Sequence, residues 1–202
     1  MRRRHFVVGS LLSATVMAGA VHPPAARIPG SDRVVNDPDA YDVYAALLQA
    51  RRDSGGPDAG EYVIRRETLT VRTGCAVRGE PTDPAWRPAL ADYLAVNADP
   101  HLLVEGYAFD RPYTLVADAE LHEATAPDTS KWEGFYRRYP SADGYVTFSN
   151  VGFSPDHTRA VVYVEHACAP LCGGARLEFL QYHDGRWRPL QVAGVRTCGW
   201  IS

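Results

Sequence analysis

Residues 158–192 read TRAVVYVEHACAPLCGGARLEFLQYHDGRWRPLQV, and this stretch decides the fold. Its short apolar runs are separated by turn-forming residues: a loop bounded by two cysteines, a Gly-Gly pair and an Asp-Gly pair. Residues 158–166 are apolar on both faces, which is typical of a central strand. Pro189 has no N–H to donate, so the strand at 187–192 is expected at a sheet edge. The stretch therefore predicts an antiparallel meander.

Helical patterns precede the meander. Apolar residues at helical spacing predict one helix that ends before Ser54, a second within residues 84–97, and a third at 130–139. Asp37 or Asp39 can cap the first helix. Each helix has one apolar face, so each is expected to pack against a core.

Helices first and a meander second indicate an α+β domain. Two further strands are predicted at residues 61–73 and 113–123. We expect the N-terminal helices to pack on one face of a curved antiparallel β-meander, a shape that resembles cystatin-like cones. The chain has 202 residues with 46% apolar and 22% charged composition, which suits one globular domain, here residues 41–202.

The first twenty residues have the pattern of a secretory signal peptide. Residues 2–4 are arginines, an apolar stretch follows, and residues 18–20 read Ala-Gly-Ala, with small residues at a cleavage site. The apolar stretch of about 15 residues is shorter than the roughly 20 of a membrane span. We expect a mature protein that is periplasmic or extracellular, with no membrane insertion after cleavage. Residues 21–40, rich in Pro, Ala and Asp, are expected to form a flexible tether.

Two export routes fit this signal. Residues 3–7 read RRHFV and resemble the twin-arginine signal, while an arginine-rich Sec signal fits equally. Removal of residues 1–20 takes away three arginines and no acid, so the formal net charge goes from −3 to −6. An acidic chain with Lys131 as its only lysine is poorly suited to nucleic acid. The expected partner is a protein or a small ligand.

The chain contains four cysteines, which are Cys75, Cys168, Cys172 and Cys198. An even number in an oxidising compartment favours two disulfides, and four cysteines allow three connectivities. The spacing favours Cys168 with Cys172 across a short loop, and Cys75 with Cys198.

A copper site is the alternative for the short loop. Two thiolates separated by three residues resemble the loop of the dinuclear copper centre of cytochrome oxidase. In this chain Arg176 and Phe179 stand where the histidine and methionine ligands of that loop fall. His166 could add a ligand to Cys168 and Cys172, but a disulfide is favoured, and we expect no metal and no cofactor.

The candidate catalytic residues are Glu120 and His122. They would share one face of the strand predicted at 113–123 and could act as an acid and base pair. His122 and Glu123 match the start of a zinc-protease motif, but Ala126 stands where its second histidine is required. A solvated polar face also explains the pair. A non-catalytic binding or envelope-associated domain is therefore favoured; a secreted hydrolase and a thiol or copper carrier are the alternatives.

The last third of the chain carries a set of short motifs: Phe135-Tyr136, Tyr139-Pro140, Phe148-Ser149-x-Val151-Gly152-Phe153, Val162-Tyr163-Val164, Leu171-Cys172-Gly173, Gly185-x-Trp187 and Trp200-Ile201-Ser202. Together they resemble a family of uncharacterised exported bacterial proteins. The shared positions are mostly apolar residues, glycine and cysteine. The resemblance therefore implies export and a common sheet, and it implies no catalytic residue.

Overall fold

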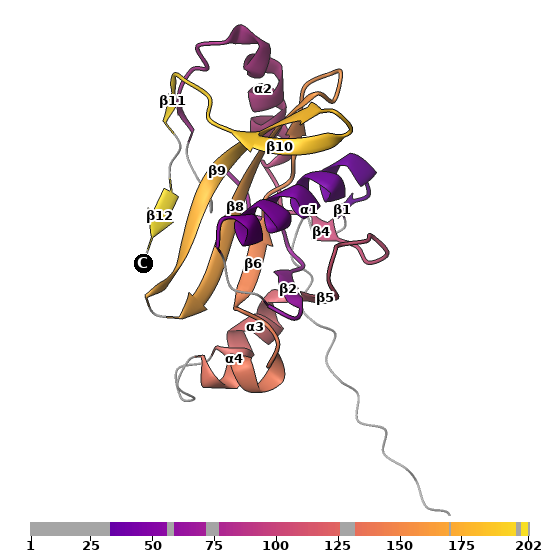
Figure 1. Cartoon of the computed structure of the whole chain (residues 1–202), viewed down its shortest axis with the longest axis vertical. Coiled ribbons are helices and arrows are strands. Elements are labelled where there is room, and N and C mark those ends of the chain that lie inside the picture. The colour runs from indigo at the N-terminus through magenta and orange to yellow at the C-terminus, as the bar shows by residue number, and fades with distance from the viewer. Residues whose placement is uncertain are drawn as a thin grey trace, which may run out of the picture.

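A computed structural model describes residues 33–55, 59–71, 77–125, 132–169, 171–196 and 199–201 (Figure 1). This part of the chain contains helices and a mixed sheet, which confirms the α+β class. The signal peptide predicted at residues 1–20 lies outside the described residues, as do Cys75 and Cys198. Within the described residues, no helix combines the length and the hydropathy needed to cross a membrane.

The sheet has eight strands. Six follow one another in the order β10 (Arg186–Leu190), β9 (Cys172–His183), β8 (Arg159–Ala169), β6 (Tyr145–Phe148), β2 (Tyr62–Arg65) and β5 (Tyr113–Val116), while β7 (Gly152–Phe153) pairs with β8 and β12 (Gly199–Ile201) pairs with β9. Strands β6 to β10 and β12 pair antiparallel, but β2 pairs parallel with both β5 and β6. The sheet is therefore mixed, and the expectation of a wholly antiparallel sheet is wrong.

Five helical segments surround the sheet: α1 (Pro38–Asp53), the 3₁₀ turn η1 (Pro84–Trp86), α2 (Arg87–Val96), α3 (Asp118–Ala124) and α4 (Glu133–Arg138). Two short strand pairs complete the described part, β1 (Val34–Val35) with β4 (Leu102–Leu103) and β3 (Arg78–Gly79) with β11 (Val195–Arg196).

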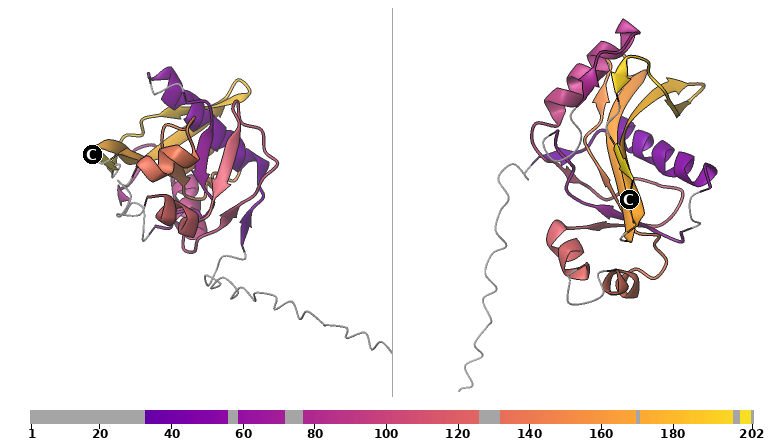
Figure 2. Two further views of the ribbon diagram at one scale, coloured as in Figure 1. Left: turned by 90° about the horizontal axis from the view of Figure 1, so that it is seen from below. Right: turned by 90° about the vertical axis from the view of Figure 1, so that its left-hand side faces the viewer.

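Helices α1 and α2 lie on opposite faces of the sheet (Figure 2). Val162 of β8 belongs to the core cluster beneath α1, whereas its neighbours Val161 and Tyr163 belong to the cluster beneath α2. Successive side chains of a strand point to opposite faces, so the apolar character of β8 on both faces serves two cores. The expectation that the helices share one face is wrong for this pair.

Helix α1 forms where the apolar spacing predicts it. The Asp37 carboxylate accepts a hydrogen bond from the N–H of Asp39 at 3.0 Å and caps the helix, and Pro38 occupies its first position. Regular structure is present before the predicted boundary at Tyr41, because β1 pairs at residues 34–35 and α1 starts at Pro38. The predicted tether is therefore wrong for residues 33–40, and its remainder lies outside the described residues.

The segment predicted as a strand at 113–123 divides into two elements. Strand β5 ends at Val116, and α3 begins at Asp118. Acidic side chains in the first helical turn, such as Asp118, interact favourably with the helix dipole. Phe135 of α4 and Tyr139 directly after it are buried in a third cluster with Leu121, so the apolar face of the helix predicted at 130–139 packs against a core.

The β8–β9 hairpin is the longest feature of the sheet. Asp184 and Gly185 both have positive φ values, 52° and 76°, so the predicted tight turn links β9 to β10. Pro189 lies on β10, which is the edge strand that its missing N–H requires. Gly173 and Gly174, expected to form a turn, lie within β9.

Candidate functional site

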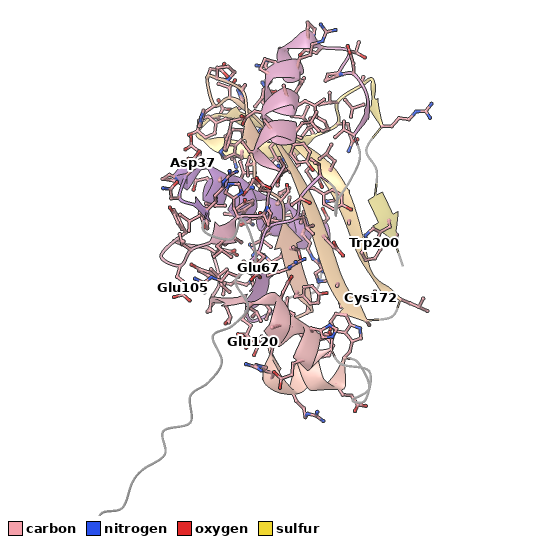
Figure 3. The ribbon with its side chains drawn as sticks, turned by 180° about the vertical axis from the view of Figure 1, so that it is seen from behind. Asp37, Glu67, Glu105, Glu120, Cys172 and Trp200 are labelled. Carbon is pink, nitrogen blue, oxygen red and sulfur yellow. A yellow bond between two sulfur atoms is a disulfide. The ribbon has the colours of Figure 1, made fainter. Side chains whose placement is uncertain are left out.

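A cleft of about 810 Å³ opens beside the end of the β8–β9 hairpin that carries the cysteines. Five elements supply its walls: α1, β6, β8, β9 and β12. Most of the lining is apolar, including Leu47, Leu48, Val146, Phe148, Val164 and Ile201. Figure 3 shows Cys172 at the far end of the hairpin and Trp200 on the adjacent short strand.

Glycines form part of the cleft wall. Gly174 pairs with His166 on β8 and with Ile201 on β12. Paired residues on neighbouring strands share a face, so these positions form one row on the face that α1 partly covers. A Cβ at Gly174 would lie 3.1 Å from the carbonyl oxygen of Trp200. The backbone of β12 therefore packs closely against Gly174 at this point of the wall.

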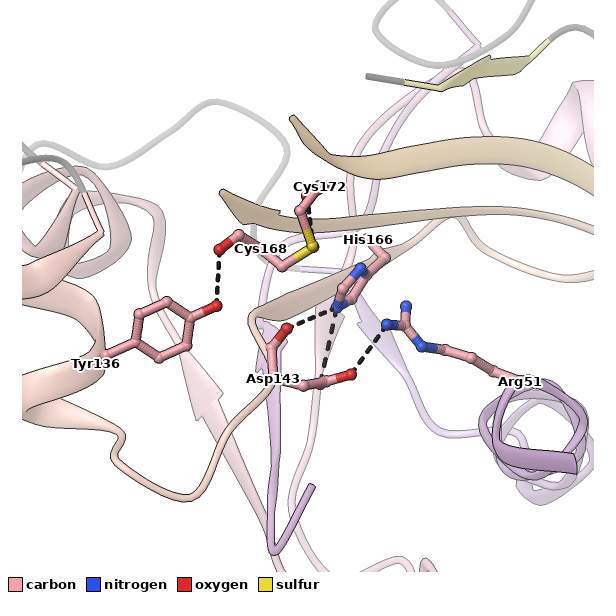
Figure 4. Close-up of a disulfide and its surroundings, with 6 residues drawn as sticks. All are labelled: Arg51, Tyr136, Asp143, His166, Cys168 and Cys172. Carbon is pink, nitrogen blue, oxygen red and sulfur yellow. Dashed lines mark hydrogen bonds and ion pairs between the residues drawn. A yellow bond between two sulfur atoms is a disulfide. The ribbon is translucent and has the colours of Figure 1, made fainter. Parts of the chain in front are cut away.

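A chain of three charged or polar side chains lies at one side of the cleft (Figure 4). Arg51 at the end of α1 donates from Nη2 to Asp143 Oδ2 at 2.9 Å. His166 Nε2 lies 3.2 Å from the carbonyl oxygen of Asp143 and 3.7 Å from its Oδ1. These contacts join α1, the turn before β6, and β8, so they hold the helix and the sheet at a defined separation.

The pKa of Asp143 is lower than its ordinary value. Burial raises the pKa, but the hydrogen bond with His166 and the charge of Arg51 together outweigh burial. The carboxylate is therefore ionised at neutral pH, and it compensates the Arg51 charge.

A disulfide closes the hairpin at the cleft. Cys168 and Cys172 are bonded, with their Cα atoms 5.2 Å apart, as the spacing predicts. Tyr136 of α4 donates a hydrogen bond to the carbonyl oxygen of Cys168 at 2.6 Å. This hydrogen bond links α4 to the end of the hairpin that carries the disulfide. The predicted bridge between Cys75 and Cys198 lies outside the described residues.

No family model matches this chain. The searches of curated proteins and of solved structures also found no match. The interpretation of the cleft rests on its residues and their contacts.

The charged side chains that line the described part of the cleft are all basic. Arg51 comes from α1 and Arg176 from β9, and His166 lies on β8, the strand next to β9. Arg176 forms an ion pair with Glu178, whose side chain is only 7% exposed, whereas that of Arg176 is 66% exposed. Neither Glu178 nor Asp143 lines the cleft. Arg51 and Arg176 therefore line the cleft, whereas the carboxylates paired with them do not.

Glu120 and His122 are not brought together as an acid and base pair. Both lie on helix α3, where residues two apart point to nearly opposite sides, so the shared strand face expected for them is wrong. Glu120 accepts a hydrogen bond from Tyr139 Oη at 3.0 Å and pairs with Arg138. This carboxylate therefore ties α3 to α4.

His122 lines a different hollow, a polar pocket of about 480 Å³ that also contains Arg65 and Glu165 but not Glu120. Burial raises the pKa of Glu165, and the charge of Arg65 partly offsets this. Asp118, one helical turn before His122, is ion-paired with Arg65. Among the described residues, no group of three or more His, Cys, Asp or Glu side chains is placed to hold a metal ion.

Proposed function

We propose that this protein is an exported, non-catalytic binding domain whose cleft beside the Cys168–Cys172 disulfide holds a small apolar molecule. The observation that carries the proposal is the cleft itself. Its volume of about 810 Å³ lies within the roughly 300–1,000 Å³ of small-molecule sites. Apolar side chains with a few convergent polar groups are the usual lining of such sites.

The chemistry of the lining favours binding over catalysis. The described lining residues include no serine, threonine, aspartate or glutamate, and the two cysteines are joined as a disulfide. His166 is held by Asp143 and has no nucleophile beside it in the lining. A thiol or copper carrier would need Cys168 and Cys172 as free thiolates.

Export is part of the same proposal. The arginines, apolar stretch and small residues of positions 1–20 follow the order of a secretory signal. The disulfide at the hairpin end is of a kind that persists in oxidising compartments. A folded, disulfide-closed domain suits a carrier or sensor of small apolar molecules outside the cytoplasm.

The test is binding of the neutral fluorescent probe N-phenyl-1-naphthylamine to the purified protein. We expect saturable fluorescence enhancement, at least tenfold weaker in Val164→Trp, because the indole fills the cleft. Thr114→Trp, which adds the same ring at an exposed position of edge strand β5, is the matched control and should bind as the wild type does. Equal binding by both variants, or none by the wild type, contradicts the proposal.

A further inference from the structure

The cleft combines an apolar lining with a basic rim in a chain that is acidic as a whole. The formal net charge of the chain is −3, yet the ionisable lining side chains that the structure describes, apart from the disulfide-bonded cysteines, are Arg51, His166 and Arg176. Asp143 and Glu178 neutralise the two arginines from outside the lining, so the lining itself presents basic side chains but no acidic one. Guanidinium N–H donors without an acidic neighbour in the lining favour anionic acceptors over neutral or cationic groups.

The two arginines keep hydrogen-bonding capacity for a ligand. A guanidinium has five N–H donors, and the ion pairs with Asp143 and Glu178 use Nη2 of Arg51 and Nε of Arg176. The partner carboxylates are recessed, since the side chains of Asp143 and Glu178 are 16% and 7% exposed against 30% and 66% for the arginines. An anion in the cleft would meet guanidinium N–H groups before it met a carboxylate.

We propose that the ligand is an anionic amphiphile, a single apolar chain that ends in a carboxylate or a similar anion; this inference rests on the proposed function. The chain would lie against Leu47, Val164 and Ile201, and the anion would accept hydrogen bonds from Arg51 and Arg176. An arginine fork matches a carboxylate in shape as well as charge.

The experiment is displacement of N-phenyl-1-naphthylamine by ten-carbon competitors that differ only in the head group. Decanoate should compete about tenfold better than decanol, and decyltrimethylammonium should compete less well than either, because charge-assisted hydrogen bonds add on the order of a factor of ten. Decyl sulfate tests whether the arginines bind any anionic head group or a carboxylate in particular. Competition as strong as that of decanoate assigns the rim to anions in general, and weaker competition assigns it to carboxylates.

The variants Arg51→Gln and Arg176→Gln should each weaken decanoate about three- to tenfold and leave decanol unchanged. Arg188→Gln, an exposed arginine on β10 outside the cleft, is the matched control and should change neither competitor. Arg176 is largely exposed, so its variant keeps the test valid if Arg51→Gln unfolds. Equal competition by decanoate and decanol overturns the inference and leaves the proposed function standing. Failure of the probe itself overturns the proposed function.

Discussion

Arg51 Nη2 lies 2.9 Å from Asp143 Oδ2, an ion pair between residues 92 positions apart in the sequence. The pair joins the end of α1 to the turn before β6, and Asp143 in turn contacts His166 on β8. The side chains are 30% and 16% exposed, so water screens the interaction only in part. This contact fixes one side of the cleft.

Asp143→Asn should destabilise the fold by about 1–2 kcal/mol at pH 7, since it leaves the half-buried Arg51 charge without compensation. Urea unfolding followed by circular dichroism measures the change. Glu105→Gln, at an exposed loop position, is the control and should stay within about 0.5 kcal/mol of the wild type. Similar stability of the two variants would show that the ion pair does not hold the cleft wall.

The low pKa of Asp143 also makes the free energy of unfolding depend on pH. Burial raises the pKa, but His166 and Arg51 lower it below the usual 3.8, so the folded state favours the ionised form. The resulting stability is present above the unfolded pKa and is lost as the pH falls through the lower folded pKa. The difference in unfolding free energy between the wild type and Asp143→Asn should be constant from pH 5 to 7 and shrink below about pH 4. A difference that persists unchanged at pH 2.5 would refute this explanation.

The Cys168–Cys172 bridge can be checked in the wild-type protein, without a substitution, by peptide mapping. Trypsin cleaves after Arg159 and Arg176, so both cysteines fall in one peptide, residues 160–176. Without reduction this peptide should be two hydrogen atoms lighter than after reduction and should not react with a thiol reagent. Two reactive thiols that bind copper(I) would instead support the carrier hypothesis.

Loss of that bridge has a predictable cost. In the chain-entropy model a closed loop of five residues stabilises the fold by about 2 kcal/mol, so Cys168→Ala with Cys172→Ala should lower stability by about that amount. Probe binding should weaken as well, because the hairpin end that borders the cleft loses its closure. Unchanged stability and unchanged binding would show that the loop is held by other contacts, such as the Tyr136 hydrogen bond.

Gly152, the glycine of the Phe-Ser-x-Val-Gly-Phe motif, lies against helix α2. A Cβ at this position would lie 2.2 Å from the backbone nitrogen of Tyr93, so α2 packs directly on the backbone of β7. Gly152→Ala should therefore push α2 away and cost more than about 3 kcal/mol, measured as the loss of the cooperative thermal transition. A melting temperature close to that of the wild type would contradict this packing.

Sequence patterns predict the elements whose structure depends mainly on neighbouring residues. Helix α1 follows from its cap and apolar spacing, β8 from its two apolar faces, and the β9–β10 turn from Asp184 and Gly185. The strand predicted at 113–123 is wrong from residue 118 onward, where Ala, Glu and Leu favour helix.

No local sequence pattern predicts the cleft. Its walls come from the segments 47–51, 146–148, 164–168, 172–176 and 199–201, and the parallel pairing of β2 with β5 and β6 joins distant segments in the same way. Only tertiary packing brings such segments together. The Gly-Gly pair at 173–174 shows the difficulty, since glycine signals a turn in most sequences but forms part of a cleft wall in this one.

A ¹H–¹⁵N NMR titration of the uniformly labelled protein with decanoate tests whether the cleft beside the disulfide binds apolar molecules. We expect saturable shifts centred on the amides of His166, Gly173 and Gly174, with little change around His122 and Glu165 in the separate polar pocket. Shifts centred on that polar pocket, or no saturable shifts, would contradict this expectation.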